Sequence, residues 1–264
     1  MKKTFNGHWD SLGNGPPILC ISGFASGNWM YRPLAQTLAD RHTSILPDNR
    51  GMGLSPPATQ PYTLDDLAGD VIALMDQLEH ETFTLIGLSM GGFIAQLIAA
   101  RHPERVKRLV LMCTSSNDAA FKGLFPMLSR EQISAIYMLR REERVRAALS
   151  ETFCPFLFNR YPDTHAYILE HRLRFEPESA QVLLQYDAVA RFFASEPVPL
   201  ERLTMPTLIL SGALDLVVPS VNAQMLASRI PNAQARIIDE TDHLFFLEKS
   251  AEVNGLIRDF LGAP

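Results

Sequence analysis

The sequence predicts an α/β fold with a mostly parallel, doubly wound sheet and an inserted helical cap. From Pro17 onward, short apolar runs alternate with longer segments of helical period, the pattern of parallel strands joined by crossover helices. From about residue 117 to residue 199 the alternation stops, and it resumes at Thr207. We therefore expect residues 1–116 and 200–264 to form the core and residues 117–199 to form the cap.

Individual elements follow from their own local patterns. Strands are expected where short apolar runs are bounded by turn residues, at Ile18–Ser22, Ser44–Leu46, Phe83–Gly87, Leu109–Cys113, Thr207–Ser211 and Ala235–Ile238. Core helices are expected where apolar residues recur with a period near 3.6, at Met30–Ala39, Leu64–Leu78 and Met90–His102. The last of these ends before Pro103, which cannot continue it. In the cap, the clearest helical periods are Arg130–Leu149 and Pro177–Phe193.

Composition restricts the classes of partner. With 264 residues, 47% of them hydrophobic, the chain can bury a large core. A formal charge of -5 and a pI near 5.8 give no broad basic surface for nucleic acid or an anionic membrane, so a small-molecule partner is predicted. Met1–His8 has no apolar run of a secretory signal, and no segment approaches the roughly 18 apolar residues of a membrane span.

The cysteines favour a reducing compartment. Cys20, Cys113 and Cys154 are odd in number and far apart, and the first two lie in apolar strand-like runs, where a thiol packs as a small hydrophobic group. This pattern predicts a cytoplasmic protein. There is no Cys/His pair with zinc-site spacing and no phosphate-binding loop of the GxxxxGK[ST] type, so we predict no metal and no nucleotide cofactor.

A G-x-S-x-G motif marks the predicted nucleophile. It lies within Thr82–Phe93, where an apolar strand-like run passes into a helical pattern. A serine hydroxyl is a weak nucleophile and must be presented to a base on a sharp turn, which crowds the residues two before and two after it. Glycines at 87 and 91 relieve this crowding. Ser89 is therefore the predicted nucleophile, and a glycine-rich turn with an incidental serine is the alternative.

Chain order identifies the acid and the base. In a fold with this elbow they follow the serine, each in a loop after a later strand. Asp215 is the single carboxylate in the apolar turn after Thr207–Ser211, and of the seven histidines His243 alone lies beyond it. We predict a triad of Ser89, Asp215 and His243. Asp215 could instead cap a turn, and Asp239 and Asp242 are weaker candidates because they share the histidine's own loop.

The loop after the first predicted core strand is expected to bind the oxyanion. Its sequence, Ile21–Gly27, carries two glycines, which let backbone N–H groups approach a ligand closely. A tetrahedral intermediate needs two such donors. We assign them to Phe24 in this loop and to Met90, the residue after the nucleophile.

Together these motifs resemble the α/β-hydrolase superfamily over about residues 15–262. Besides Gly87–Gly91, Asp215 and His243, the segment Asp48–Ser55 is similar to the family's D-x-R-G-x-G-x-S motif, which is chiefly structural. Ser22-Gly23 stands where the family usually has His-Gly. The chain looks most like small capped carboxylesterases and enol-lactonases, which implies a cofactor-independent serine hydrolase acting on a small carboxylic ester or lactone through an acyl-enzyme.

Other activities stay open at this point. A carbon–carbon bond hydrolase or a lyase could use the same triad, a perhydrolase-like side activity is possible on this fold, and some relatives are non-enzymatic ligand receptors. Aromatic residues of the cap could line the pocket or form the cap's own core; they include Phe121, Phe125, Tyr137, Phe153, Phe156 and Phe158. His165 is expected at a helix end or on the cap surface.

Overall fold

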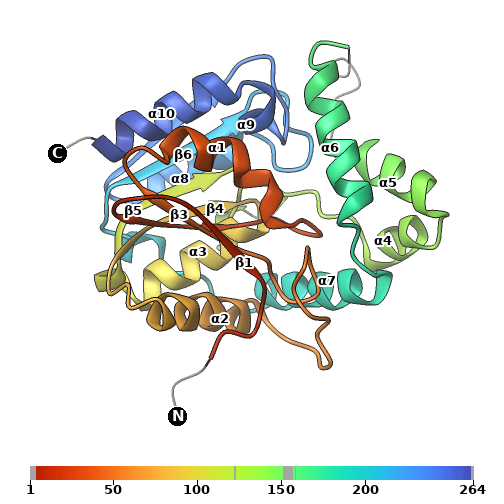
Figure 1. Cartoon of the computed structure of the whole chain (residues 1–264), viewed down its shortest axis with the longest axis horizontal. Helices are drawn as coiled ribbons and strands as arrows, with labels where there is room; N and C mark the ends of the chain where they lie inside the picture. Colours follow the sequence, from red (N-terminus) through yellow and green to blue (C-terminus); the bar gives the residue numbers. More distant parts are fainter. Residues whose placement is uncertain (1–3, 122, 151–156, 158, 263–264) are drawn as a thin grey trace.

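The computed structural model describes residues 4–121, 123–150, 157 and 159–262 and shows one sheet covered by helices (Figure 1). The strands are β1 (Trp9–Gly13), β2 (Pro17–Ile21), β3 (Thr43–Pro47), β4 (Phe83–Leu88), β5 (Val106–Met112), β6 (Thr207–Gly212) and β7 (Ala233–Ile238). They form a seven-stranded sheet in the order β1-β3-β2-β4-β5-β6-β7. β1 pairs antiparallel with β3 and every other pair is parallel, which confirms the predicted fold class.

Helices connect the strands in the alternating order expected of this class. They are α1 (Arg32–Leu38), α2 (Leu64–Gln77), α3 (Met90–Arg101), α4 (Arg130–Tyr137), α5 (Arg141–Ser150), α6 (Pro162–Arg174), α7 (Ser179–Phe193), α8 (Val221–Arg229), α9 (Phe245–Glu248) and α10 (Ser250–Gly262). Short 3-10 turns lie at Asn28–Tyr31, Pro103–Arg105, Ala119–Phe121 and Leu200–Arg202. The capping box of α2 fixes its start, because Thr63 and Asp66 satisfy each other's backbone N–H groups.

Side chains on each central strand alternate between two hydrophobic clusters, as the two-residue period of a strand requires. In β2, Leu19 and Ile21 pack with α2 and α3, whereas Ile18 and Cys20 pack with α1 and α10. Figure 1 shows α1 and α10 on one face of the sheet and α2 and α3 on the other. Burial on both faces explains why these strands appear in the sequence as continuous apolar runs.

Several elements differ from the sequence prediction. The edge strand β1 was not predicted because its sequence, Trp9–Gly13, is partly exposed and has no apolar run. The helix predicted over Met30–Ala39 is a 3-10 turn followed by α1. The helix predicted over Arg130–Leu149 is divided into α4 and α5, so that α4 packs on α7 and α5 packs on α6. His165 is buried in the first turn of α6, so it lies at a helix end, one of the two predicted places, and not on the cap surface.

Helices α4–α7 come after β5 and before β6 in the chain, and they gather beside one side of the sheet (Figure 1). Their placement is consistent with an inserted cap, although the boundaries 117–199 stay a prediction. Two glutamines of α7 reach the core: Gln181 bonds both backbone groups of Ala58, and Gln185 bonds the backbone of Ala25. Cys154, Phe153, Phe156 and Phe158 lie outside the described residues.

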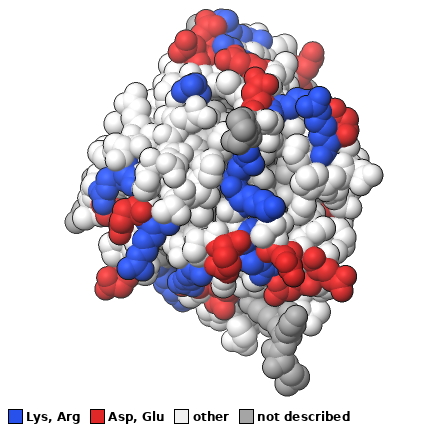
Figure 2. Space-filling model, turned by 90° about the vertical axis from the view of Figure 1, so that its left-hand side faces the viewer, with Lys and Arg blue, Asp and Glu red and all other residues white. Residues whose placement is uncertain are grey.

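Within the described part of the chain, no helix combines the length and apolar character that crossing a bilayer requires. The face drawn in Figure 2 carries acidic and basic side chains next to one another, so neither sign covers it. The prediction that nucleic acids and membranes are not partners is not tested by these observations and stays a prediction.

Gly91 allows α3 to pack directly against β2, which yields a prediction about stability. A Cβ at position 91 would overlap the carbonyl oxygen of Ile21, whereas a Cβ at Gly255 in α10 would meet nothing within 4 Å. We expect Gly91→Ala to lower the free energy of unfolding by about 3 kcal/mol or more, because backbone cannot move aside cheaply. Gly255→Ala should raise it by about 0.5–1 kcal/mol through helix propensity. Urea unfolding checks both, and equal stability of the two variants would contradict this account of the packing.

Candidate active site

Ser89 sits on a strained turn between β4 and α3. Its backbone has φ 52° and ψ -116°, a conformation rarely adopted by a residue with a side chain. Three hydrogen bonds hold the turn: Ser89 N–H donates to Met112 (2.8 Å), and Ser89 carbonyl accepts from the N–H of Gly92 and the hydroxyl of Thr114 (2.8 Å each). A Cβ at Gly87 would overlap the carbonyl oxygen of Gly91. The crowding inferred from the motif is therefore present.

Asp215 and His243 are hydrogen-bonded to each other. Asp215 follows β6, and its Oδ2 lies 2.8 Å from Nδ1 of His243. The other carboxylate oxygen accepts from the N–H groups of Val217 (2.9 Å) and Val218 (2.8 Å). Both residues are buried, at 4% and 6% exposure. The carboxylate is thus fixed in place and favours the tautomer of His243 with its proton on Nδ1, which leaves Nε2 free to accept a proton.

Backbone contacts bring the loops of Asp215 and His243 together. Leu214 N–H donates to the carbonyl of Thr241 (2.8 Å), and Ala213 N–H donates to Ile238 (2.9 Å). The two alternative acids serve elsewhere. Asp242 accepts from the N–H of Leu244 (3.1 Å) within its own loop, and Asp239 is exposed.

The predicted residues meet at one cavity. Ser89, His243, Phe24 and Met90 all line it, while Asp215 lies behind His243. Phe24 lies in the loop after β2, and Ser89 and Met90 directly follow β4. Asp215 lies in the loop after β6, and His243 in the loop after β7. The carboxyl ends of these parallel strands share one edge of the sheet. Most other lining side chains are apolar and come from both the core and the cap. The cavity has a volume of about 220 Å³, which is below the roughly 300–1,000 Å³ of typical drug-sized ligand sites.

Cap aromatics divide between the two roles considered from the sequence. Phe125 and Tyr137 line the cavity, whereas Phe121 belongs to the core cluster. Phe93 of α3 joins the two regions: its ring stacks on Phe192 with centroids 5.1 Å apart and meets Phe125 edge-on at 5.9 Å. Such pairs stabilise an aromatic wall on one side of the cavity.

The loop after β2 lies directly against the nucleophile. A Cβ at Gly23 would be 3.3 Å from both the Ser89 Cβ and the Leu88 carbonyl oxygen. Ser22, which stands where the resembling family usually has histidine, is fully buried and donates its hydroxyl to the carbonyl of Gly27 (3.1 Å). Ser22 therefore closes the loop on itself and so helps to fix its shape.

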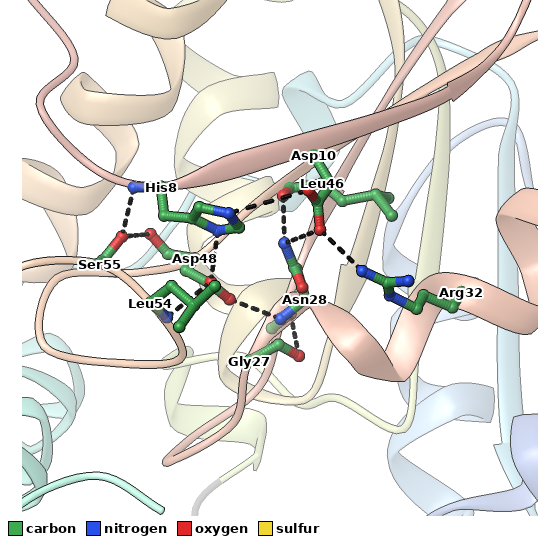
Figure 3. A network of polar contacts seen from close by, with 10 residues as sticks. His8, Asp10, Gly27, Asn28, Arg32, Leu46, Asp48, Leu54 and Ser55 are labelled. Atoms are coloured by element: carbon green, nitrogen blue, oxygen red, sulfur yellow. Dashed lines mark hydrogen bonds and ion pairs between the residues drawn. The ribbon is translucent and has the colours of Figure 1, made fainter. Parts of the chain in front are cut away.

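A polar network around Asp48 supports the far end of this loop (Figure 3). Asp48 Oδ1 accepts from Asn28 N–H (2.6 Å), and its Oδ2 accepts from Leu54 N–H (3.0 Å) and lies 2.9 Å from Nδ1 of His8. Ser55 in turn donates its hydroxyl to the Asp48 carbonyl (2.7 Å). The Asp48–Ser55 motif is structural in this chain: it ties the N-terminal segment to the loop that begins at Ser22.

Opposing effects act on the pKa of His243. Burial lowers it, but the Asp215 carboxylate stabilises the imidazolium, and the pKa is raised above the usual value of 6.5. The Cys113 thiol lies beside this pair. Burial raises the pKa of Cys113, so it is a neutral thiol near neutral pH. In this respect Cys113 behaves as the small buried group expected from the sequence.

Three side chains of this region, those of Cys113, Asp215 and His243, are of the types that bind metal ions. One ligand atom from each lies within 4.8 Å of the other two. However, Asp215 Oδ2 and His243 Nδ1 are 2.8 Å apart, which is a hydrogen-bond distance and closer than two ligands of a tetrahedral metal ion usually stand. These donors fit a hydrogen-bonded pair with a neighbouring thiol better than a metal centre.

Arg172 is a cavity residue that the sequence did not reveal. It projects from α6 and lines the cavity together with Ser89. Its Nε atom is buried without a hydrogen-bond partner, and no carboxylate of the described residues lies within ion-pair distance of it. Burial lowers the pKa of its guanidinium, with Tyr137 opposing this, yet an arginine stays charged at neutral pH. The sequence offered no signal, because α6 itself was not predicted.

The Asp215–His243 pair predicts a change in titration. In Asp215→Asn, burial acts on His243 without the opposing carboxylate, so its pKa should fall below the wild-type value. The NMR signals of His243 followed across pH measure its pKa. Asp239 is exposed and lies in the same loop as His243, so Asp239→Asn should leave the pKa of His243 unchanged. Because a raised pKa stabilises the folded state at low pH, the stability advantage of wild type over Asp215→Asn should shrink as pH rises through the folded pKa. An unchanged His243 pKa in Asp215→Asn would refute the coupling.

Comparison with known proteins identifies the family of this fold. The family described as alpha/beta hydrolase fold matches residues 16–250. A poly(3-hydroxyalkanoate) depolymerase of Ectopseudomonas oleovorans is 28% identical over 250 residues, covering 93% of this chain and 84% of the relative. The 2-hydroxymuconate semialdehyde hydrolase of a Pseudomonas species is 30% identical over 260 residues, covering 94% and 88%. A solved thermophilic esterase from Thermogutta terrifontis has a TM-score of 0.79 and 26% identity, over 96% of this chain and 92% of that one. The chain therefore belongs to the α/β-hydrolase fold family, as the sequence resemblance predicted.

Proposed function

We propose that this protein is a serine hydrolase that cleaves a small carboxylic ester or lactone through an acyl-enzyme intermediate. The observation that carries the proposal is the buried hydrogen bond between His243 and Asp215, next to a serine presented on a strained turn at the same cavity. The esterase and depolymerase relatives support ester chemistry, and the small apolar cavity supports a small substrate.

In the first step, Ser89 Oγ attacks the substrate carbonyl carbon while Nε2 of His243 removes the hydroxyl proton. Asp215 stabilises the imidazolium that forms. The N–H groups of Phe24 and Met90 donate to the oxyanion of the tetrahedral intermediate. When this intermediate collapses, the carbon–oxygen bond to the leaving group breaks and His243 returns the proton to the departing alkoxide.

The second step repeats this chemistry with water. His243 takes a proton from water as the water oxygen attacks the acyl carbon, and the bond to Ser89 breaks with the proton returned to its Oγ. With a lactone, the leaving alcohol stays attached to the acyl group and is released with it as a hydroxy acid. No oxidant, metal or cofactor enters either step.

A covalent probe and one substitution test the proposed nucleophile. A fluorophosphonate should label wild-type protein at Ser89, and Ser89→Ala should neither be labelled nor hydrolyse short p-nitrophenyl esters, with a loss of at least about 10³-fold in kcat. Ser228→Ala is the control, since Ser228 is an exposed serine on α8 outside the lining of this cavity. Residual ester hydrolysis in Ser89→Ala, or labelling at another serine, would overturn the assignment.

Arg172 indicates what else the substrate carries. Arg172 is partly buried, and its Nε is fully buried without a partner. A cation in this position without a counter-ion is costly, and a ligand that supplies an anion reduces that cost. Within the described lining, Arg172 is the side chain with a permanent charge, and the surrounding wall is largely apolar. We therefore infer that the ester or lactone bears a carboxylate, which pairs with Arg172 while its carbonyl reaches Ser89.

Matched substrates test this inference. Monoethyl adipate and ethyl hexanoate have acyl chains of equal length and differ in one terminal carboxylate. Arg172→Met should lower kcat/KM for the charged ester by about 10²-fold, the usual cost of removing one partner of a buried charge pair, and should leave the neutral ester within about threefold. Arg174→Met, an exposed arginine on the same helix, is the control. An equal loss of kcat/KM for both esters would show that Arg172 does not bind the carboxylate.

A carbon–carbon bond hydrolase is the second candidate function. The hydrolase of 2-hydroxymuconate semialdehyde among the relatives gives this reading its support. The same serine, histidine and anion-binding arginine could serve it. Identification of products by mass spectrometry separates the two, because ester cleavage releases an alcohol and carbon–carbon cleavage does not. A non-enzymatic receptor would bind ligand without any product, and it would be contradicted by labelling of Ser89 with a fluorophosphonate.

A further inference from the structure

The tip of the oxyanion loop is held by a residue of the cap. Gln185 lies on α7, 160 positions away from Ala25 in the chain, and its Oε1 accepts from the Ala25 N–H at 2.6 Å. Gln185 is fully buried. Ala25 directly follows Phe24, which is one of the two proposed oxyanion donors, so this hydrogen bond acts one peptide unit away from the chemistry.

Ala25 has a backbone conformation that requires outside support. Its φ is 50°, in the left-handed region that residues other than glycine seldom adopt. Such a conformation persists where surrounding contacts determine it. Ser26 contributes one, because its hydroxyl donates to the Phe24 carbonyl at 3.1 Å. Ser22 and the Asp48 network fix the two ends of the loop, and Gln185 fixes its tip.

The amide of Gln185 is committed to this contact. Because the Ala25 N–H is a donor, the side-chain oxygen must face it, which leaves the nitrogen pointing away. That nitrogen, Nε2, is buried and has no hydrogen-bond partner among the described residues. A buried polar group without a partner opposes folding. Among the described residues, the Gln185 side chain thus hydrogen-bonds through its oxygen to Ala25, and loss of Gln185 would leave a buried N–H of the loop without an acceptor.

We propose that Gln185 is a positioning residue for the oxyanion hole: it holds the Phe24–Ala25 peptide so that the Phe24 N–H faces the reacting carbonyl. Because Gln185 belongs to α7, the oxyanion hole is complete only when this helix is packed against the core. The inference rests on the proposed acyl transfer. It adds that the cap contributes to the chemical step through the oxyanion loop, in addition to enclosing the substrate.

Gln181 provides a matched control one turn earlier on the same helix. Its amide also bonds core backbone, at Ala58 N–H (2.8 Å) and the Ala58 carbonyl (3.2 Å). Ala58 and Gln181 do not belong to the lining of the cavity that holds Ser89. Gln181 therefore shares with Gln185 the role of fastening α7 to the core, but its hydrogen bonds go to Ala58 and not to the oxyanion loop.

The experiment compares Gln185→Met with Gln181→Met, since methionine matches glutamine in length but accepts no comparable hydrogen bond. Gln185→Met should lower kcat by about 10- to 100-fold, part of the 10²- to 10³-fold attributed to one oxyanion donor, with KM within about threefold. Affinity for a trifluoromethyl ketone, whose serine adduct carries an oxyanion, should fall by a similar factor. Gln181→Met should lower the melting temperature and leave kcat within about twofold.

A conservative variant separates positioning from folding. Gln185→Glu retains an oxygen that can accept from Ala25, and it should recover most of the kcat lost in Gln185→Met. The inference fails if Gln185→Met keeps wild-type kcat, if both methionine variants lose kcat equally, or if Gln185→Glu is no better than Gln185→Met. Failure of the proposed function looks different, because wild-type protein would then show neither ester turnover nor reaction with a fluorophosphonate.

Discussion

Backbone packing between α3 and β2 is the constraint on which the site depends. Since Gly91 has no side chain, the start of α3 lies against the end of β2, and the chain between β4 and α3 must turn sharply at Ser89. The same contact brings the loop leaving β2 beside the serine, as the approach of Gly23 to Ser89 shows. One close approach therefore places both the proposed nucleophile and the proposed oxyanion loop.

Much of the core could be predicted because its strands are buried on both faces. β2, β4 and β6 are each built around a run of buried apolar residues, and their predicted limits agree with the observed ones to within one residue. Where burial is partial, the signal weakens. β1 is an edge strand with a polar, exposed sequence, and α6 alternates charged and apolar residues without a clear stripe, so neither was found.

The proposed triad could be located from the sequence because topology, and not local pattern, brings it together. Parallel strands end at one edge, so residues after β4, β6 and β7 must be neighbours wherever they lie in the chain. Arg172 and Gln185 could not be found this way. Their importance depends on which side of a cap helix faces the sheet, and no strand register determines how the cap is seated.

The cavity joins two different kinds of wall. The core side presents backbone groups held by short hydrogen bonds, while the cap side presents apolar side chains and the guanidinium of Arg172. A rigid polar edge is suited to stabilising charge that develops during a reaction. The wall formed by helices α4–α7 is suited to selecting which molecule enters, and through Gln185 the same helices also touch the loop proposed to stabilise that charge.

The link between His8 and Asp48 gives the extreme N-terminal segment a part in shaping the site (Figure 3). His8 lies far from Ser89 in the chain, yet it contacts the carboxylate that holds Asn28 at the base of the oxyanion loop. An affinity tag fused close to this segment, or trimming of the residues before Trp9, would therefore disturb this loop while the pairing of β1 with β3 stayed in place. Recombinant versions of the protein are better tagged at the opposite terminus, where α10 ends far along the chain from this network.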